Sequence, residues 1–166
     1  MVVEWVWSDT TKKEEMMKRL ILSSLIIGLV MLAVTGFAQR SPKVQYFNFL
    51  GSSGDQPFST VVLVGDTLYM GAASAVDPAT GAPPPDIQDE ARIAMDGVKA
   101  RLALAGMTMD DLVVVRVFSP DRSLYSDFNA VYRTYFKDHF PARMFIGSGY
   151  LSGGTHFEVS GIAVRR

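Results

Sequence analysis

The chain has 166 residues, and its 16 basic and 17 acidic side chains leave a formal net charge of −1 at pH 7. This balance excludes the concentrated basic face that nucleic-acid binding usually requires. The sequence contains no cysteine, which excludes disulfides, thiolate catalysis and cysteine-ligated metals, and its two histidines are too few for a histidine-rich metal site. We therefore expect neither a metal nor another cofactor.

The most apolar stretch of the sequence lies near its N-terminus. Residues 20–38 carry no charge, directly follow two basic residues, and end with small side chains at Gly36 and Ala38. This order is typical of a secretory signal that is cleaved before Gln39. The alternative is an uncleaved membrane anchor, because 19 apolar residues can just span a bilayer. In either case we expect an exported protein, periplasmic or secreted by a bacterium.

These features divide the chain into three parts. Residues 1–15 form an extension to which we assign no function, and Met16 or Met17 is an alternative start for the signal or anchor of residues 16–38. Residues 39–166 remain as one domain with 12 basic and 13 acidic side chains. Its 128 residues are enough to bury a hydrophobic core.

The first half of this domain predicts three strands and a helix. The strands are expected over residues 44–49, 60–64 and 67–71, the last two joined by a type II′ turn because glycine stands first in Gly65-Asp66. Asp86 is the expected N-cap of a helix that runs to Ala105 with apolar residues at a spacing of three and four.

The second half predicts a buried strand over residues 112–118, an amphipathic helix over 127–139, and strands over 143–150 and 156–164. We expect the last two strands to pair as a hairpin. The order of elements predicts an α+β fold, a two-layer sandwich with a mixed sheet and two helices on one face.

The other face of this sheet has no predicted cover. Strand residues Val62, Tyr69, Val114 and Phe145 would leave a large apolar surface in water. Surfaces of this kind usually mark a subunit interface, so the pattern predicts an oligomer.

Several short motifs follow one another in the domain. They read GDTLYMG, DPATG, AGMTMDDLV, FNAVYRTYF, FPARMF and HFEVSGIAVRR. Together they resemble the RidA (YjgF) family of imine and enamine deaminases over nearly all of residues 39–166. The resemblance implies a chorismate-mutase-like fold, a homotrimer with ligand clefts between subunits, and hydrolysis of small 2-imino acids or their enamine tautomers to 2-keto acids and ammonia.

The resemblance also assigns two principal site residues. It places the family's carboxylate-binding arginine at Arg143, which suits a planar, permanently charged guanidinium; the alternative is an arginine on the surface at a strand start. It places the acidic residue that handles the attacking water at Glu158, which the alternation of the last strand puts on one face with His156 and Ser160. The alternative for Glu158 is a strand cap or a partner of a nearby arginine.

Four further positions are expected to bind or enclose the substrate. Gly71 matches a strand end that contacts ligand in the family, and Phe58 and Phe145 are expected to form walls of the pocket. Asn129 is either a hydrogen-bonding group in the cleft or a helix cap. Phe58 and Phe145 stand where relatives commonly carry tyrosine and cysteine, so the pocket is expected to be more apolar.

The expected hairpin separates the two principal residues. It would place Glu158 about five positions from the residues opposite Arg143, or roughly 17 Å at the usual strand rise. The two residues could contact one small ligand only if a bulge intervenes or if they come from different chains, and we expect a site shared between subunits. A second hypothesis is a binding module without catalysis, the same trimer holding a small carboxylate in the cell envelope.

The N-terminal segment allows a direct test. When the full chain is expressed in a bacterial host, we expect N-terminal sequencing of the exported protein to begin at Gln39. A membrane-bound product that retains residues 20–38 would contradict cleavage and select the anchor.

Overall fold

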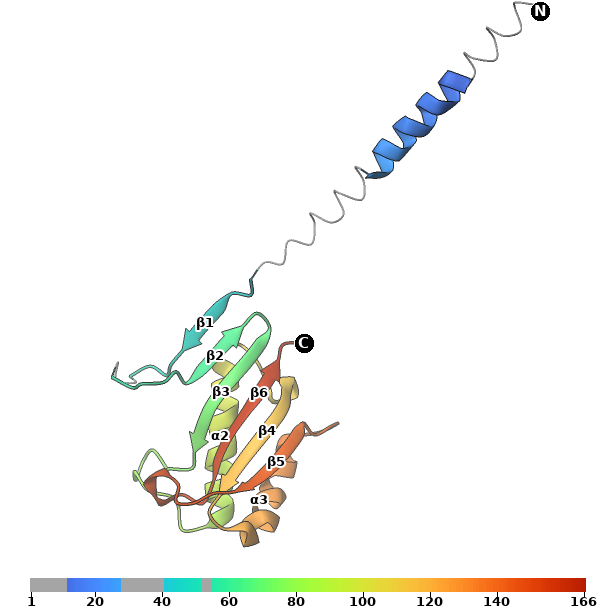
Figure 1. Ribbon diagram of the computed structural model, residues 1–166. Coiled ribbons are helices and arrows are strands. Elements are labelled where there is room, and N and C mark those ends of the chain that lie inside the picture. The colour runs from blue at the N-terminus through green and yellow to red at the C-terminus, as the bar shows by residue number, and fades with distance from the viewer. Residues whose placement is uncertain (1–11, 28–40, 52–54) are drawn as a thin grey trace, which may run out of the picture. The chain divides into compact units, whose positions relative to one another are not determined.

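The computed structural model describes residues 12–27, 41–51 and 55–166 (Figure 1). The chain divides into two units, Met1–Ser41 and Pro42–Arg166. In the first unit, residues 12–27 form a helix. No helix in the described residues is long and apolar enough to cross a membrane. Residues 28–38, which include the predicted cleavage point, lie outside the described residues, so the signal or anchor stays a prediction.

The second unit is built on one mixed sheet of six strands in the order β1-β2-β3-β6-β4-β5. Only β4 and β5 pair in parallel; the other neighbours are antiparallel. The strands are β1 (Val44–Phe47), β2 (Val61–Val64), β3 (Thr67–Ser74), β4 (Leu112–Ser119), β5 (Ala142–Gly147) and β6 (Glu158–Val164). The mixed sheet and the α+β class predicted from the sequence are confirmed.

The predicted hairpin between the last two strands is wrong. β6 lies between β3 and β4, whereas β5 forms the edge of the sheet and pairs with β4 alone (Figure 1). The residues of β6 explain this position, because Val159, Gly161 and Ala163 are all buried and the strand has ladder partners on both sides. A strand with a fully buried face is more stable inside a sheet than at its edge.

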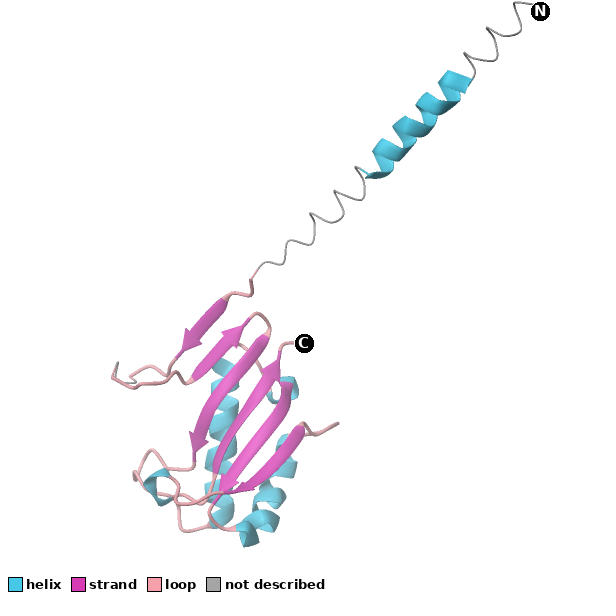
Figure 2. Cartoon of the chain, viewed as in Figure 1, coloured by secondary structure: helices cyan, strands magenta, loops and turns pink. Residues whose placement is uncertain are grey.

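Helices α2 (Ile87–Leu104) and α3 (Tyr125–Tyr132) cover one face of the sheet (Figure 2). The start of α2 is as predicted, because the Asp86 carboxylate accepts hydrogen bonds from the backbone N–H groups of Gln88 and Asp89. Gly97 allows this helix to approach β3 closely, since a Cβ there would lie 3.0 Å from the Cβ of Ala73.

The second helix is shorter than predicted. α3 ends at Tyr132, and a single 3-10 turn, Arg133–Tyr135, follows it. The rings of Phe136 and Phe140, which follow that turn, pack on each other and on Tyr132 at the end of α3. The centroid distances are 4.8–6.0 Å. The aromatic residues that indicated a helix as far as residue 139 therefore form a packed cluster, of which the later members lie outside the helix.

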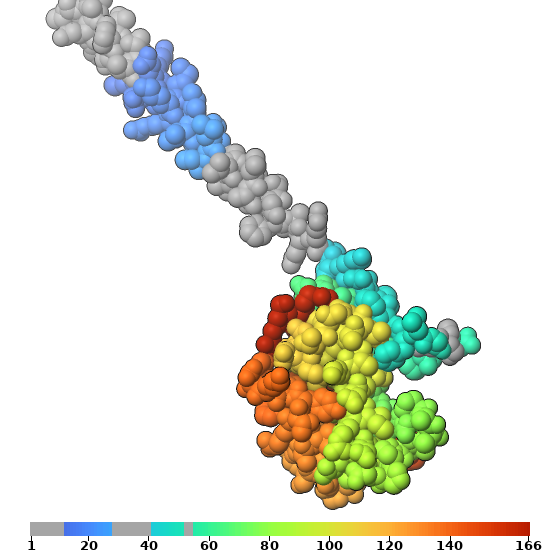
Figure 3. All heavy atoms as spheres, turned by 180° about the vertical axis from the view of Figure 1, so that it is seen from behind, coloured from blue at the N-terminus to red at the C-terminus, as the bar shows by residue number. Residues whose placement is uncertain are grey.

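The face opposite the helices is apolar, as the sequence indicated. One row of ladder partners crosses five neighbouring strands: Tyr46, Val62, Tyr69, Ile162 and Val114. Tyr46 is 69% exposed and Tyr69 is 48% exposed. Figure 3 shows the other side, which α2 and α3 cover. Phe145 does not belong to the exposed row as predicted, because it packs toward the helices against Phe128.

A buried carboxylate joins α2 to the start of β6. Glu90 in the first turn of α2 is 1% exposed. It accepts hydrogen bonds from the backbone N–H groups of His156 and Phe157, and one of its oxygens lies 2.8 Å from His156 Nδ1. The sequence analysis did not single out this residue. Its contacts fix the chain immediately before Glu158.

Replacing this carboxylate is expected to destabilise the domain. Glu90→Ala would leave two backbone N–H groups without an acceptor, so we expect the free energy of unfolding to fall by about 2–4 kcal/mol. Glu90→Gln keeps one acceptor oxygen and is expected to lose less than half as much. Urea denaturation of both variants measures the difference, and equal losses would contradict an acceptor role.

Candidate functional site

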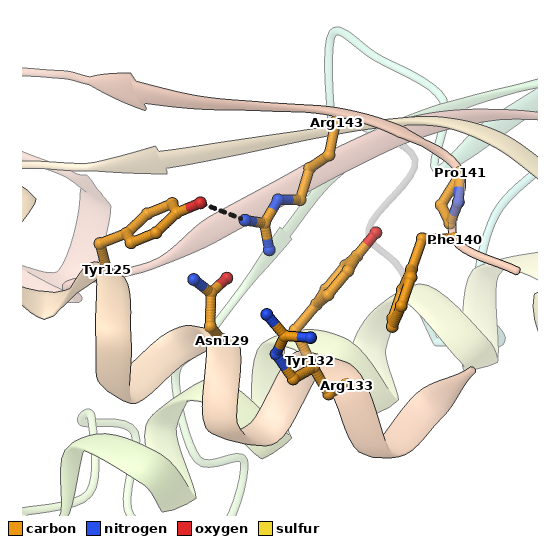
Figure 4. A pocket seen from close by; sticks show the side chains of 7 residues that line it. All are labelled: Tyr125, Asn129, Tyr132, Arg133, Phe140, Pro141 and Arg143. Atoms are coloured by element: carbon orange, nitrogen blue, oxygen red, sulfur yellow. Dashed lines mark hydrogen bonds between the residues drawn. The ribbon is translucent and has the colours of Figure 1, made fainter. Parts of the chain in front are cut away.

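A cavity of about 200 Å³ lies between α3 and the beginning of β5 (Figure 4). Its wall contains hydroxyl, amide and guanidinium groups next to aromatic rings, and no acidic side chain. The lining residues are Tyr125, Asn129, Tyr132, Arg133, Phe140, Pro141 and Arg143. The cavity therefore combines hydrogen-bond donors with positive charge.

Local structure explains why these side chains meet. Tyr125, Asn129 and Tyr132 follow one another at intervals of four and three residues, which places them on one face of α3. Arg143 comes from the second position of β5, where its ladder partner is the fully buried Val115. Because ladder partners share a face of the sheet, Arg143 points toward the helix layer.

Arg143 is held by aromatic side chains. Its Cζ lies 4.5 Å from the ring centroid of Tyr132 and 5.4 Å from that of Tyr125. Its Nη2 donates a hydrogen bond of 3.3 Å to the Tyr125 hydroxyl (Figure 4). In the described part of the chain it forms no ion pair with a carboxylate. The guanidinium is thus oriented by cation–π contacts, with donors left for an external anion.

Tyr132 supplies a second unsatisfied group. The residue is 3% exposed, and its hydroxyl is buried without a hydrogen-bond partner among the described residues. Burial raises the pKa of Tyr132 to about 12, although the nearby Arg143 acts in the opposite direction. The hydroxyl is therefore a neutral donor at physiological pH. Buried polar groups are normally paired, so an unpaired one in a cavity wall is a candidate ligand contact.

Asn129 lies in the middle of α3, whose N-cap is Leu124, so its interpretation as a helix cap is wrong. It lines the cavity together with Arg143. A hydrogen bond with Asn129, followed in size by the positive charge of Arg143, lowers the pKa of Tyr125. These three residues form one connected polar group on the cavity wall.

Glu158 lies elsewhere in the protomer. Its ladder partners are Ser74 and Phe118, whereas Arg143 lies beside Val115. On β4 the two positions are three residues apart, an odd number, so the side chains of Glu158 and Arg143 leave opposite faces of the sheet. Glu158 forms no ion pair in the described residues. A small ligand within one chain cannot contact both residues.

The three other predicted residues do not line the cavity. Gly71 is needed by the backbone itself, because a Cβ there would lie 3.2 Å from the carbonyl oxygen of Thr60, to which its N–H donates. Phe58 is 64% exposed. The half-buried Phe145 ring packs edge-on against Tyr125, with a centroid distance of 5.2 Å.

Sequence reasoning missed most of the cavity wall. Tyr132 lay within the predicted amphipathic helix over 127–139 without a role in binding, and Tyr125, Arg133 and Phe140 were not singled out. The available signal was the spacing of polar residues at 125, 129, 132 and 133, which places them along one side of a helix. In the described ranges, no group of three acidic or histidine side chains could hold a metal ion.

Comparison with known proteins agrees with this architecture. Residues 53–165 match the family model described as endoribonuclease L-PSP. The chain is 34% identical over 113 residues to a protein of Escherichia coli K12 named 2-iminobutanoate/2-iminopropanoate deaminase, covering 66% of this chain and 88% of the relative.

Two further relatives cover similar lengths. A RutC family protein of Sulfurisphaera tokodaii is 34% identical over 105 residues, which are 63% of this chain and 84% of that protein. The crystal structure of E. coli TdcF with bound serine aligns with a TM-score of 0.64 at 28% identity, over 77% of this chain and 100% of that one. The chain therefore belongs to the endoribonuclease L-PSP family, the family of RidA (YjgF) that its motifs resemble.

Proposed function

We propose that the domain is an enzyme that hydrolyses small, reactive 2-imino acids or their enamine tautomers to 2-keto acids and ammonia. The observation that carries the proposal is the half-buried Arg143, which lines a small cavity and has no acidic partner among the described residues. The name of the E. coli deaminase, whose sequence matches most of the domain, supports the reaction class.

Arg143 is proposed to bind the substrate carboxylate. A guanidinium can donate two parallel hydrogen bonds to a carboxylate, which fixes both the position and the plane of that group. The rings of Tyr125 and Tyr132 hold the guanidinium before substrate arrives. Little side-chain freedom is then lost on binding, which favours affinity for a small ligand.

Glu158 is proposed to act on the water. The carboxylate accepts a proton from water as the water oxygen bonds to the imine carbon, and it passes that proton to the nitrogen as the C=N double bond becomes a single bond. In the resulting carbinolamine the carboxylate transfers the hydroxyl proton to the amino nitrogen, and the C=O bond forms as ammonia leaves. Water and imine are consumed, and keto acid and ammonia are released, without an oxidant or a reductant.

The two residues are proposed to meet between chains of a homotrimer. Glu158 projects from the sheet face that carries the exposed row of Tyr46, Tyr69 and their neighbours, while Arg143 lies at the edge strand β5. Packing the exposed face of one protomer over the β5 edge of the next would bury the apolar row and bring the two groups together. We further propose that this assembly functions after export, directed by residues 20–38.

Removal of the guanidinium is expected to weaken catalysis strongly. Arg143→Ala should lose about 2 kcal/mol of charge-assisted binding, or about 30-fold in kcat/KM. Glu158→Gln should lower kcat by about 100-fold or more, because the amide cannot accept the proton. Keto-acid release from enzymatically generated 2-iminopropanoate measures both effects. Arg92→Ala, on the exposed side of α2, is the matched control, and an active Arg143→Ala variant would refute the assignment.

A site shared between chains has a second signature. Arg143→Ala and Glu158→Gln chains, each strongly impaired alone, should recover part of the activity when they are unfolded together and refolded, since some interfaces then carry both native residues. Analytical ultracentrifugation should give three times the protomer mass. No recovery in verified mixed trimers would contradict a site that combines Arg143 and Glu158 from different chains, and binding of pyruvate without turnover would select the non-catalytic alternative.

A further inference from the structure

A second arginine faces the same cavity. Arg133 follows α3 directly, lines the cavity, and places its Cζ 6.0 Å from the ring centroid of Phe140. Figure 4 shows its guanidinium turned toward the space that Asn129 and Arg143 also face. Like Arg143, it forms no ion pair in the residues that the structure describes. Its charge also contributes to lowering the pKa of Tyr125.

The wall that one chain forms around this small cavity carries two cations and no anion. None of the seven lining residues is acidic, so the positive charge of Arg133 and Arg143 is not neutralised within the wall. Like charges raise each other's electrostatic energy, and an anion that bridges them removes this unfavourable term. The arrangement therefore favours a ligand with two negative groups over a ligand with one.

The neutral groups of the cavity lie along the same wall. The Asn129 amide and the buried, unpaired hydroxyl of Tyr132 both belong to α3, which also leads directly into Arg133. The amide provides a donor for a ligand that reaches from one guanidinium to the other, and the Tyr132 ring forms the wall between them. Carboxylates match guanidinium geometry through two parallel hydrogen bonds, which a single extended diacid could form at both ends.

We propose, on the basis of the function proposed above, that the cavity selects dicarboxylates and that its substrates are dicarboxylic 2-imino acids of four or five carbons. Arg143 binds the carboxylate next to the imine carbon, and Arg133 binds the carboxylate at the far end of the side chain. Water addition and loss of ammonia proceed as before and release a dicarboxylic 2-keto acid.

The first test measures binding alone. Isothermal titration of the purified full-length protein with 2-oxoglutarate and 2-oxobutanoate compares a diacid and a monoacid that share the 2-keto acid end. We expect the diacid to bind at least tenfold more tightly. Arg133→Gln should remove most of this preference and Arg133→Lys should keep part of it, whereas Arg92→Gln, an exposed arginine already paired with Asp89, should keep all of it.

The second test measures turnover. Imines generated from glutamate and from 2-aminobutyrate by amino-acid oxidases are compared by kcat/KM, and we expect the ratio to favour the diacid and to fall about tenfold in Arg133→Gln. Faster hydrolysis of the monoacid imine would overturn the inference and leave the proposed deaminase intact. If neither imine is hydrolysed, the proposed function fails, and the titration still decides whether the cavity selects dicarboxylates. Equal binding of both keto acids overturns that selectivity.

Discussion

Coverage of only one face of the sheet is the constraint on which the architecture depends. Helices α2 and α3 bury the core side, while the row from Tyr46 to Val114 crosses five strands with no described element over it. Burial of apolar area stabilises a protein or complex by about 25 cal/mol per Å². The exposed row thus supplies a driving force for association, and it shares its face with Glu158.

The cavity depends on a different interaction, the cation–π contacts between Arg143 and the aromatic rings that hold it. Tyr132 is anchored in the core by contact with Phe128 and presents the face of its ring to Arg143. The buried carboxylate of Glu90 performs a comparable task for β6, since it fixes the two residues immediately before Glu158. In both cases a buried side chain on one element sets the position of a charged group on another.

Local signals in the sequence were sufficient for most elements but not for their pairing. Asp86 and the apolar spacing after it predicted α2 closely, because a cap and a helical face are determined within a few turns. The position of β6 between β3 and β4 depends on contacts far apart in the chain, and adjacency in sequence wrongly suggested a hairpin. Arg143 was assigned through the family resemblance and Asn129 from its place near a helix start, whereas Tyr132 resembled an ordinary core residue until its unpaired hydroxyl was located.

The cavity is lined by both buried and exposed side chains, and this difference has an evolutionary consequence. Tyr132 is part of the hydrophobic core, so substitutions there change packing and stability together. Arg133, one residue further, is exposed and lies over the ring of Phe140. Mutations at position 133 can therefore alter the charge of the cavity with little penalty in folding. A descendant of this protein could acquire a new ligand preference through one substitution at this exposed position while its fold stays the same.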